Sequence, residues 1–363
     1  MVGIDRRLLQ NIDWVLLGVT VVLAALSALT LSTLVVTRAG GTVALRQLGW
    51  FGIGLVALLV VVSLDYRRLV RAAPLLYLAG LGALVSIFFI GRSVSGARRW
   101  VVVGPMSAQP SELFKLCFVL MVVWILTSRW AQPVGRGALI LTVPVIAVPT
   151  LLIVKQPDLG TALLLFPVLM ALLVGAGMHL RLLGGLVLAG VAAMPLGWLV
   201  LKDYQRERIL VFLDPFRDPL GTAYNVIQAK IAIGSGQLLG KGVAGATQSR
   251  LAFLPERHTD FIFAVFAETW GFVGCLVLLT CYALFLLRGF EIAGAAREPV
   301  GRLIAVGVTA LMATQVFVNV GMVTGLLPVV GIPLPFMSYG GSAMLVSMMA
   351  LGLLLSVRMR QFQ

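Results

Sequence analysis

Long apolar segments alternate with short polar ones along almost the whole of this 363-residue chain. A helix needs roughly 20 apolar residues to cross the hydrocarbon core of a bilayer, and ten segments approach that length. An even number of spans places both termini on the same side of the membrane. We expect the spans at about residues 14–36, 47–64, 73–91, 112–128, 138–154, 159–177, 183–201, 261–287, 303–327 and 338–357.

One connection, from about 202 to 260, is far longer than a typical loop between spans. Within it, residues 209–213 and 229–233 are apolar and need a surface to pack against. We therefore expect two re-entrant or interfacial helices there, over about 204–213 and 222–233. The pattern predicts an all-α polytopic membrane protein with a single integral membrane domain and one large extracellular loop.

Composition agrees with a membrane protein. Only 12% of the residues are charged and 60% are hydrophobic, whereas soluble domains carry roughly 25% charged residues. The three cysteines lie in apolar runs, and two histidines far apart in the chain are too few for a zinc site. We expect no disulfide framework, no protein-bound metal and no nucleic-acid partner.

Positive charge indicates which side of the membrane faces the cytoplasm. With the N-terminus inside, 13 arginines fall in inner segments and 6 arginines or lysines in short outer loops. The inner set is Arg6, Arg7, Arg67, Arg68, Arg71, Arg129, Arg136, Arg181, Arg288, Arg297, Arg302, Arg358 and Arg360, and the outer set is Arg38, Arg46, Arg92, Arg98, Arg99 and Lys155. Short cytoplasmic loops are the ones enriched in arginine and lysine, so we expect both termini in the cytoplasm.

A charged run, residues 254–261, leads directly into the eighth span. It places Asp260 where the bilayer meets water, so the carboxylate can be partly desolvated and still reach a substrate. Desolvation raises the pKa of a carboxyl group, which makes it a useful general base or acid near neutral pH. A simpler interpretation has Thr259 or Asp260 as the N-cap, with Arg257 and His258 as ordinary interfacial residues.

Several charges lie inside or at the rim of the expected spans, where each costs free energy and needs a reason. Glu112 and Lys115 open the fourth span one helical turn apart and share a face. Asp158 lies in a short loop, and Glu268 lies two turns into the eighth span. These residues either line a polar cavity that opens outward or form ion pairs that fix the helix register, such as Lys115 with Asp158 or with Glu112.

Two further segments have both a functional and a structural interpretation. Arg99 and Trp100 lie in the loop before the fourth span, where they would bind phosphate or rest at the lipid headgroups. Residues 338–342, Ser-Tyr-Gly-Gly-Ser, predict a turn that starts the tenth span. The two glycines there permit close approach of the backbone to another helix or to a ligand.

Taken together, five motifs resemble the SEDS family (shape, elongation, division and sporulation), in matching order and over nearly the whole chain. The run Pro-Glu-Arg-His-Thr-Asp and the short tails look like the elongation branch of that family rather than the division branch. Thr269 departs from the pattern, because a second glutamate commonly follows the residue equivalent to Glu268. The motifs are Gln109-Pro-Ser-Glu112 with Lys115, Lys155-Gln-Pro-Asp-Leu-Gly160, residues 228–236, residues 254–261 and residues 338–342.

The resemblance implies a peptidoglycan glycosyltransferase that polymerises lipid II at the outer face of the bacterial cytoplasmic membrane during cell elongation. It implies a class B penicillin-binding protein as partner, which we expect to pack against the eighth and ninth spans. No cofactor is implied with certainty, although the reaction can involve Mg²⁺ or Mn²⁺. We assign Asp260 as the catalytic residue. The assigned substrate-binding residues are Glu112, Lys115, Asp158, Arg99, Trp100, Arg257, His258, Glu268 and Ser338.

A base at Asp260 suits this reaction, because the 4-hydroxyl of an acceptor sugar must lose a proton as it attacks the anomeric carbon. Lys115, Arg99, Arg250 or Arg257 could stabilise the departing pyrophosphate. The alternative function is a flippase or transporter of the same lipid-linked precursor. A flippase needs polar groups along a path through the whole membrane, whereas the ionisable residues here gather at the outer rim. A scaffold that only recruits a partner would leave the buried charges unexplained.

Overall fold

The computed structural model describes residues 11–361 except 35–37, 95–96, 104–105, 132–133, 215–216, 219–220, 222, 247–253 and 255. In chain order its helices and strands are α2 (Trp14–Thr33), α3 (Arg38–Ser63), α4 (Tyr66–Arg71), α5 (Ala73–Ile90), β1 (Arg92–Val94), β2 (Ala97–Val103), β3 (Met106–Ala108), α6 (Pro110–Thr127), the 3₁₀ helix η1 (Arg129–Ala131), α7 (Arg136–Lys155), α8 (Leu159–Gly175), α9 (Leu180–Val200), α10 (Asp203–Leu213), α11 (Tyr224–Ser235), α12 (Gly242–Gly245), α14 (Ile262–Ala295), α15 (Pro299–Thr324) and α16 (Gly341–Met359).

The ten expected spans are present. Among the described residues, nine helices have at least 18 residues and are apolar enough to cross a membrane, and α8 is a slightly shorter apolar helix of 17. Their ends follow local signals. Asp13 caps α2 by accepting a hydrogen bond from the backbone N–H of Leu16, and Gly325 ends α15 in the left-handed conformation that glycine favours. The all-α polytopic prediction is confirmed.

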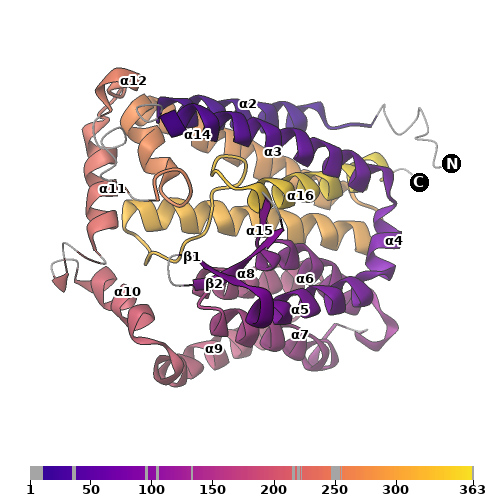
Figure 1. Cartoon of the computed structure of the whole chain (residues 1–363). Coiled ribbons are helices and arrows are strands. Elements are labelled where there is room, and N and C mark those ends of the chain that lie inside the picture. Colours follow the sequence, from indigo (N-terminus) through magenta and orange to yellow (C-terminus); the bar gives the residue numbers. More distant parts are fainter. Residues whose placement is uncertain are drawn as a thin grey trace.

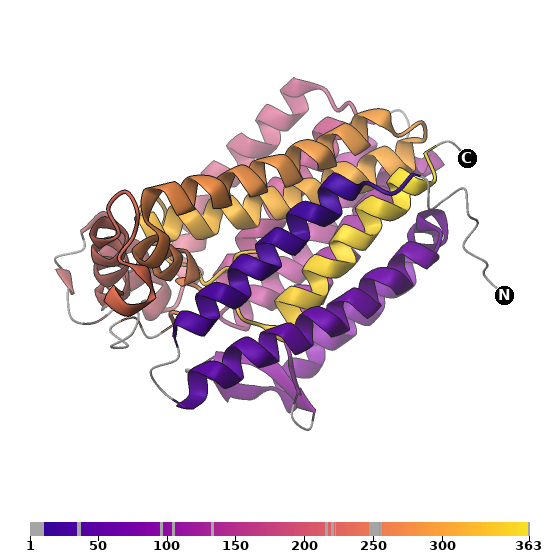
Figure 2. The same ribbon diagram turned by 90° about the horizontal axis from the view of Figure 1, so that it is seen from above.

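The start of α2 and the end of α16 lie at one end of the molecule, and the helices of the long loop lie at the other. Figure 1 shows these two helix ends on the side that carries α4, with α11 and α12 at the opposite end. The view from above in Figure 2 shows the same separation. Because consecutive spans run in opposite directions, the starts of α6, α8, α14 and α16 all lie at the end that carries the long loop.

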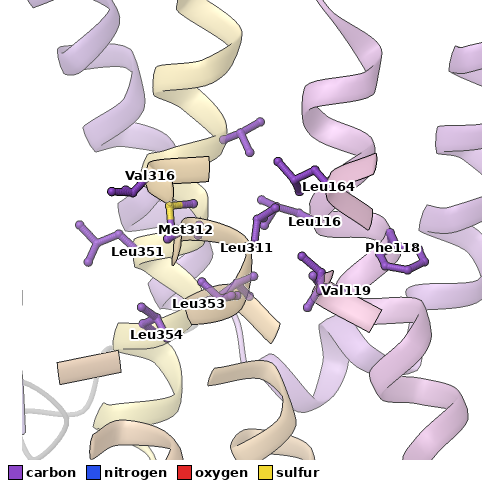
Figure 3. Close-up of a cluster of buried hydrophobic side chains, with 14 of the residues drawn as sticks. Leu116, Phe118, Val119, Leu164, Leu311, Met312, Val316, Leu351, Leu353 and Leu354 are labelled. Atoms are coloured by element: carbon purple, nitrogen blue, oxygen red, sulfur yellow. The ribbon is translucent and has the colours of Figure 1, made fainter. Parts of the chain in front are cut away.

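The core forms where α15 packs against α6 and α8 on one side and α16 on another. Figure 3 shows the buried side chains that fill this region, including Val119, Leu164, Leu311 and Leu354. Small residues allow the helices to approach closely. A side chain at Gly307 on α15 would collide with Val119 and Leu172, so only glycine fits there.

The outer loop before α6 contains a feature that the apolar pattern did not anticipate. Strands β1, β2 and β3 form a three-stranded antiparallel sheet in the order β1-β2-β3. Apolar and polar residues alternate over too few positions here for the sequence pattern to distinguish these strands from a loop. The sheet matters because β2 carries Arg99 and Trp100.

Within the long loop, α10 and α11 match the residue ranges of the two predicted helices closely. The residues after α11 then join α14 at a break in that helix, where Gly271 has φ 67°. Backbone N–H groups of Phe272 and Val273 donate to the carbonyls of Gln237 and Leu238 at 2.8 and 3.0 Å. These hydrogen bonds fix the long loop to the N-terminal part of α14, the helix that follows the charged run.

Candidate functional site

Asp158 lies at the centre of a buried polar network. It is 2% exposed and caps α8, accepting from the N–H of Thr161 at 3.3 Å. Its other carboxylate oxygen accepts from Nε2 of Gln109 at 3.1 Å and from Oγ of Ser111 at 3.2 Å. The start of α6 is thereby fixed to the start of α8.

Arg99 extends this network from the sheet. Its Nη1 lies 3.8 Å from Oδ1 of Asp158, and its Nε is buried without a hydrogen-bond partner in the described part of the chain. Trp100 follows Arg99 on β2, and neighbouring strand residues point to opposite faces of a sheet. The structure therefore brings Arg99 to Asp158 and directs Trp100 away from it.

Glu112 and Lys115 form the ion pair that their spacing predicted. Lys115 Nζ lies 2.7 Å from Glu112 Oε2, and the two side chains are only 1% and 4% exposed. Of the two ion-pair alternatives for Lys115, Glu112 rather than Asp158 is its partner. The pair lies one turn inside α6, behind the Gln109–Asp158 contact.

Residues 256–260 form a tight turn immediately before α14. The backbone N–H groups of Thr259 and Phe261 donate to the carbonyl of Glu256 at 3.3 and 3.2 Å. The N-cap of α14 is Phe261, which makes no side-chain capping bond, while Thr259 Oγ1 donates to Glu256 Oε2 at 3.1 Å. The interpretation of Thr259 or Asp260 as a helix cap is wrong, so the Asp260 carboxylate is not used by the helix.

The segment 331–340 packs against this turn. Oγ of Ser338 donates to the carbonyl of Thr259 at 2.7 Å and accepts from the N–H of Leu334 at 2.8 Å. Gln47 on α3 holds the same segment, because its Nε2 donates to the carbonyl of Ser338 at 3.1 Å. Ser338 is 2% exposed, and its hydroxyl is engaged with the protein, which favours positioning of the turn over direct contact with a substrate.

The surroundings of Asp260 make its carboxyl group weakly acidic. Burial raises the pKa of Asp260 to about 6, and the carboxylate of Glu256 adds to that rise. The cations of Arg208 and Arg99 lower the pKa by smaller amounts, and Asp158 raises it slightly. Through these influences the charges of Arg99 and Asp158 are coupled to the protonation of Asp260.

His258 and Arg257 flank the turn. Burial lowers the pKa of His258 below its usual value, so the imidazole is neutral at pH 7. Its ring lies 5.8 Å from that of Tyr339, centroid to centroid. Burial also lowers the pKa of Arg257, although a guanidinium stays charged at neutral pH.

Glu268 faces a different part of the molecule. Its side chain is fully buried in α14, and Oε1 lies 4.0 Å from Nζ of Lys241, which lies between α11 and α12. The backbone N–H of Lys241 also donates to the carbonyl of Glu268 at 2.9 Å. This contact belongs to the junction between the long loop and α14, so Glu268 is a weaker candidate for binding substrate than the sequence indicated.

Three residues of the site escaped the sequence reasoning. Gln109 and Ser111 were quoted within a motif, yet the chemical argument gave them no role beside Asp158. Arg208 on α10 influences Asp260 and donates from Nη1 to the carbonyl of Val329 at 3.4 Å. Its charge within the predicted helix 204–213 was the available signal, but sequence gives no distance from that helix to Asp260. Arg250 lies outside the described residues.

An apolar cavity of about 490 Å³ lies between α8, α15 and the loop after α15. Leu163 and Phe317 line it and are 60% and 70% exposed, so the cavity opens toward the surroundings of the helices. The loop that lines it continues through Gly331, where a Cβ atom would lie 3.2 Å from Oδ2 of Asp260. The loop that lines the apolar cavity thus also lies against the Asp260 carboxyl group, at Gly331.

The described residues contain no group of three or more histidine, cysteine, aspartate or glutamate side chains that could hold a metal ion. The donor set of a resident metal site is therefore missing from this part of the chain, and no reaction step is assigned to a metal here. The three cysteines are free.

The fold and the site define a polytopic membrane protein with a weakly acidic carboxyl group and two nearby cations at one end of its helix bundle. The chain belongs to the FtsW/RodA/SpoVE family of cell cycle proteins, whose model matches residues 7–363. It is 44% identical over 349 residues to the peptidoglycan glycosyltransferase MrdB of Escherichia coli K12, covering 95% of this chain and 94% of MrdB.

Solved structures agree in fold. A chain from a study of the structural coordination of polymerization and crosslinking by a peptidoglycan synthase complex aligns with a TM-score of 0.83 and 34% identity, covering 97% of this chain and 99% of that one. The crystal structure of the rod shape determining protein RodA from Thermus thermophilus aligns with a TM-score of 0.74 and 32% identity, covering 97% and 98%. The family that the motifs resembled is confirmed.

Proposed function

We propose that this protein is a peptidoglycan glycosyltransferase that polymerises lipid II at the outer face of the bacterial cytoplasmic membrane during cell elongation. The observation that carries the proposal is the Asp260 carboxyl group, with a pKa of about 6, beside the cations of Arg99 and Arg208. The activity in the name of the E. coli relative supports the same reaction.

In this proposal Asp260 is the general base. The 4-hydroxyl oxygen of the acceptor sugar attacks the anomeric carbon of the donor, its proton passes to the Asp260 carboxylate, and the bond from that carbon to the pyrophosphate oxygen breaks. A pKa near 6 leaves about nine-tenths of the carboxylates ionised at pH 7 while keeping them basic enough to accept a proton.

Arg99 and Arg208 are the cations that would stabilise the departing pyrophosphate. Guanidinium groups bind phosphate oxygens through paired N–H donors, and the buried Nε of Arg99 has a donor available. We propose that any Mg²⁺ or Mn²⁺ that the reaction uses is bound by pyrophosphate oxygens rather than by a protein cluster. Titration of the substrate-free protein with Mn²⁺ would then give no stoichiometric binding.

The apolar cavity supports a lipid-linked substrate. A polyprenyl tail must stay in an apolar environment while its pyrophosphate end reaches the catalytic base. The cavity between α8 and α15 provides that environment, and its lining loop passes Asp260 at Gly331. A soluble sugar donor would not require such a groove.

The test of this function is polymerisation of fluorescent lipid II by the purified protein. Wild type should give a ladder of glycan chains, and Asp260→Asn, which keeps size and polarity, should give none. The same two preparations in vesicles measure lipid II translocation. Translocation without a ladder, at equal rates in both proteins, would reject the polymerase and establish the flippase alternative.

We further propose that a class B penicillin-binding protein binds α14 and α15 and raises the polymerase activity. The similarity to a chain from a peptidoglycan synthase complex supports this. Apolar side chains on α14 are exposed, among them Phe272, Leu276 and Val277. A photocrosslinker at Leu276 should capture the partner, whereas one at the equally exposed Val56 on α3 should not. Capture at Val56 alone would reject this interface.

A further inference from the structure

Three successive backbone carbonyls of the turn before α14 each accept a hydrogen bond from a different donor. The N–H of Tyr339 donates to the carbonyl of His258 at 2.8 Å, and Oγ of Ser338 donates to that of Thr259 at 2.7 Å. The third donor is Nδ2 of Asn319 on α15, which lies 3.0 Å from the carbonyl oxygen of Asp260. The backbone of the turn is thus fixed from outside at its last three residues, which end with Asp260.

Asn319 makes a second bond of the same kind. Its Nδ2 donates to the carbonyl of Ile332 at 2.7 Å, and the side chain is fully buried. Both partners are carbonyl oxygens, which can only accept, so the amide nitrogen must face them. The amide oxygen is then left buried without a hydrogen-bond partner in the described part of the chain. Leaving it so costs free energy, and a leucine of similar size would avoid that cost.

These two bonds fix the backbone on both sides of the Asp260 carboxylate. Ile332 follows Gly331, which has φ 74° and lies directly against the carboxylate, since a Cβ there would be 3.2 Å from Oδ2. The side-chain amide of Asn319 therefore fixes the position of the turn that carries the Asp260 carboxylate relative to Gly331, which lies against that carboxylate. Displacement of either segment would move the carboxylate relative to a bound sugar.

We propose that Asn319 is the positioning residue for Asp260. It acts through the backbone carbonyls of Asp260 and Ile332 and does not touch the substrate. The kinetic form of this inference rests on the proposed polymerase function, because it assumes that Asp260 receives the proton from the acceptor hydroxyl.

Asn319→Leu removes both donated bonds, and Asn319→Ser leaves a shorter side chain whose single hydroxyl can donate at most one of them. Loss of positioning should lower kcat for lipid II polymerisation by about 10- to 100-fold in Asn319→Leu, because small displacements of a catalytic group have effects of that order. The KM for lipid II should stay within about twofold, since the interaction is needed in the transition state rather than for binding. The acid limb of the pH profile should also move, because the carboxylate has changed its surroundings. Asn319→Ser should show a smaller change in the same direction.

Thr324→Val is the matched control. It removes a side-chain hydrogen bond on the same helix, from Thr324 Oγ1 to the carbonyl of Val320 at 2.8 Å, which does not reach the turn. It should keep kcat and the pH profile of wild type. Equal losses of kcat in Thr324→Val and Asn319→Leu, or an Asn319→Leu protein with wild-type kcat and pH profile, would overturn the proposal. A raised KM with an unmoved pH profile would also overturn it.

Hydrogen–deuterium exchange separates this inference from the proposed function. The amides of residues 256–262 should exchange faster in Asn319→Leu than in wild type and in Thr324→Val, whether or not the protein polymerises lipid II. If wild type forms no glycan, the polymerase proposal fails while faster exchange still supports the positioning role. Unchanged exchange in both Asn319 variants contradicts the positioning role in either case.

Discussion

At the scale of single residues, burial of the Asp260 carboxyl group destabilises the fold at neutral pH and also gives the group a pKa suited to a general base. Its pKa is about 6 in the folded protein against 3.8 for the free group, because burial disfavours the charge. A folded-state pKa that is raised contributes stability below pH 3.8, and that stability is lost as pH rises through about 6. At neutral pH the ionised carboxylate therefore destabilises the fold.

Asp260→Asn should accordingly be more thermally stable than wild type at pH 7.5. A shift of two units corresponds to roughly 3 kcal/mol at most, since one unit is about 1.4 kcal/mol. Unfolding in detergent at pH 7.5 and at pH 4 measures the effect, and the gain should shrink at the lower pH. A variant less stable than wild type at pH 7.5 would mean that the carboxylate makes favourable contacts in the fold.

The Glu112–Lys115 pair poses a second question at this scale. Lys115→Met leaves a buried carboxylate unpaired, and breaking a buried pair costs about 3–5 kcal/mol. The double variant Glu112→Gln with Lys115→Met should recover most of that stability. Polymerisation should stay low in the double variant, because the assignment of Lys115 to substrate binding requires its charge. If activity recovers together with stability, the Glu112–Lys115 pair has only a structural role and Lys115 does not bind the substrate.

At the scale of elements, the predicted spans were confirmed because hydropathy is a local property of the sequence. The pair of Glu112 and Lys115 could be predicted for the same reason, since helix geometry fixes residues three apart. The contact from Asn319 to Asp260 joins residues 59 positions apart and depends on how α15 packs against the turn before α14. No local pattern reports such a distance. The sheet that brings Arg99 to Asp158 was missed because its strands are short.

The break in α14 gives a prediction for an element. Gly271 has φ 67°, and a Cβ atom there would overlap with the backbone nitrogen of Gly240 in the long loop. Gly271→Ala should therefore separate the loop from α14 and lower the thermal stability by more than about 1 kcal/mol. Gly294→Ala on the same helix meets no neighbouring atom and should have no destabilising effect. Equal stabilities of the two variants would show that the junction tolerates a side chain.

At the scale of the whole molecule, the site residues lie near the starts of α6, α8 and α14, at the end of the bundle that carries the long loop, whereas α2 begins and α16 ends at the other end. We propose that the loop end faces outward, in agreement with the distribution of arginines. Val243→Cys on α12 should react with a membrane-impermeant maleimide in intact cells, and Ala295→Cys at the end of α14 should not. Both variants need a background in which Cys117, Cys275 and Cys281 are alanine. Labelling of Ala295→Cys alone would reverse the topology.

The measurement that tests the role of Asp260 most directly is the pH dependence of kcat/KM for lipid II polymerisation by the wild-type protein, measured at limiting substrate because this ratio reports the pKa of the free enzyme. The proton acceptor must be ionised, so the rate should fall tenfold per unit below a midpoint near the pKa of about 6. At pH 5 the rate should be about one-tenth of its plateau. A rate that stays constant down to pH 5, in a protein that remains folded there, would contradict Asp260 as the general base.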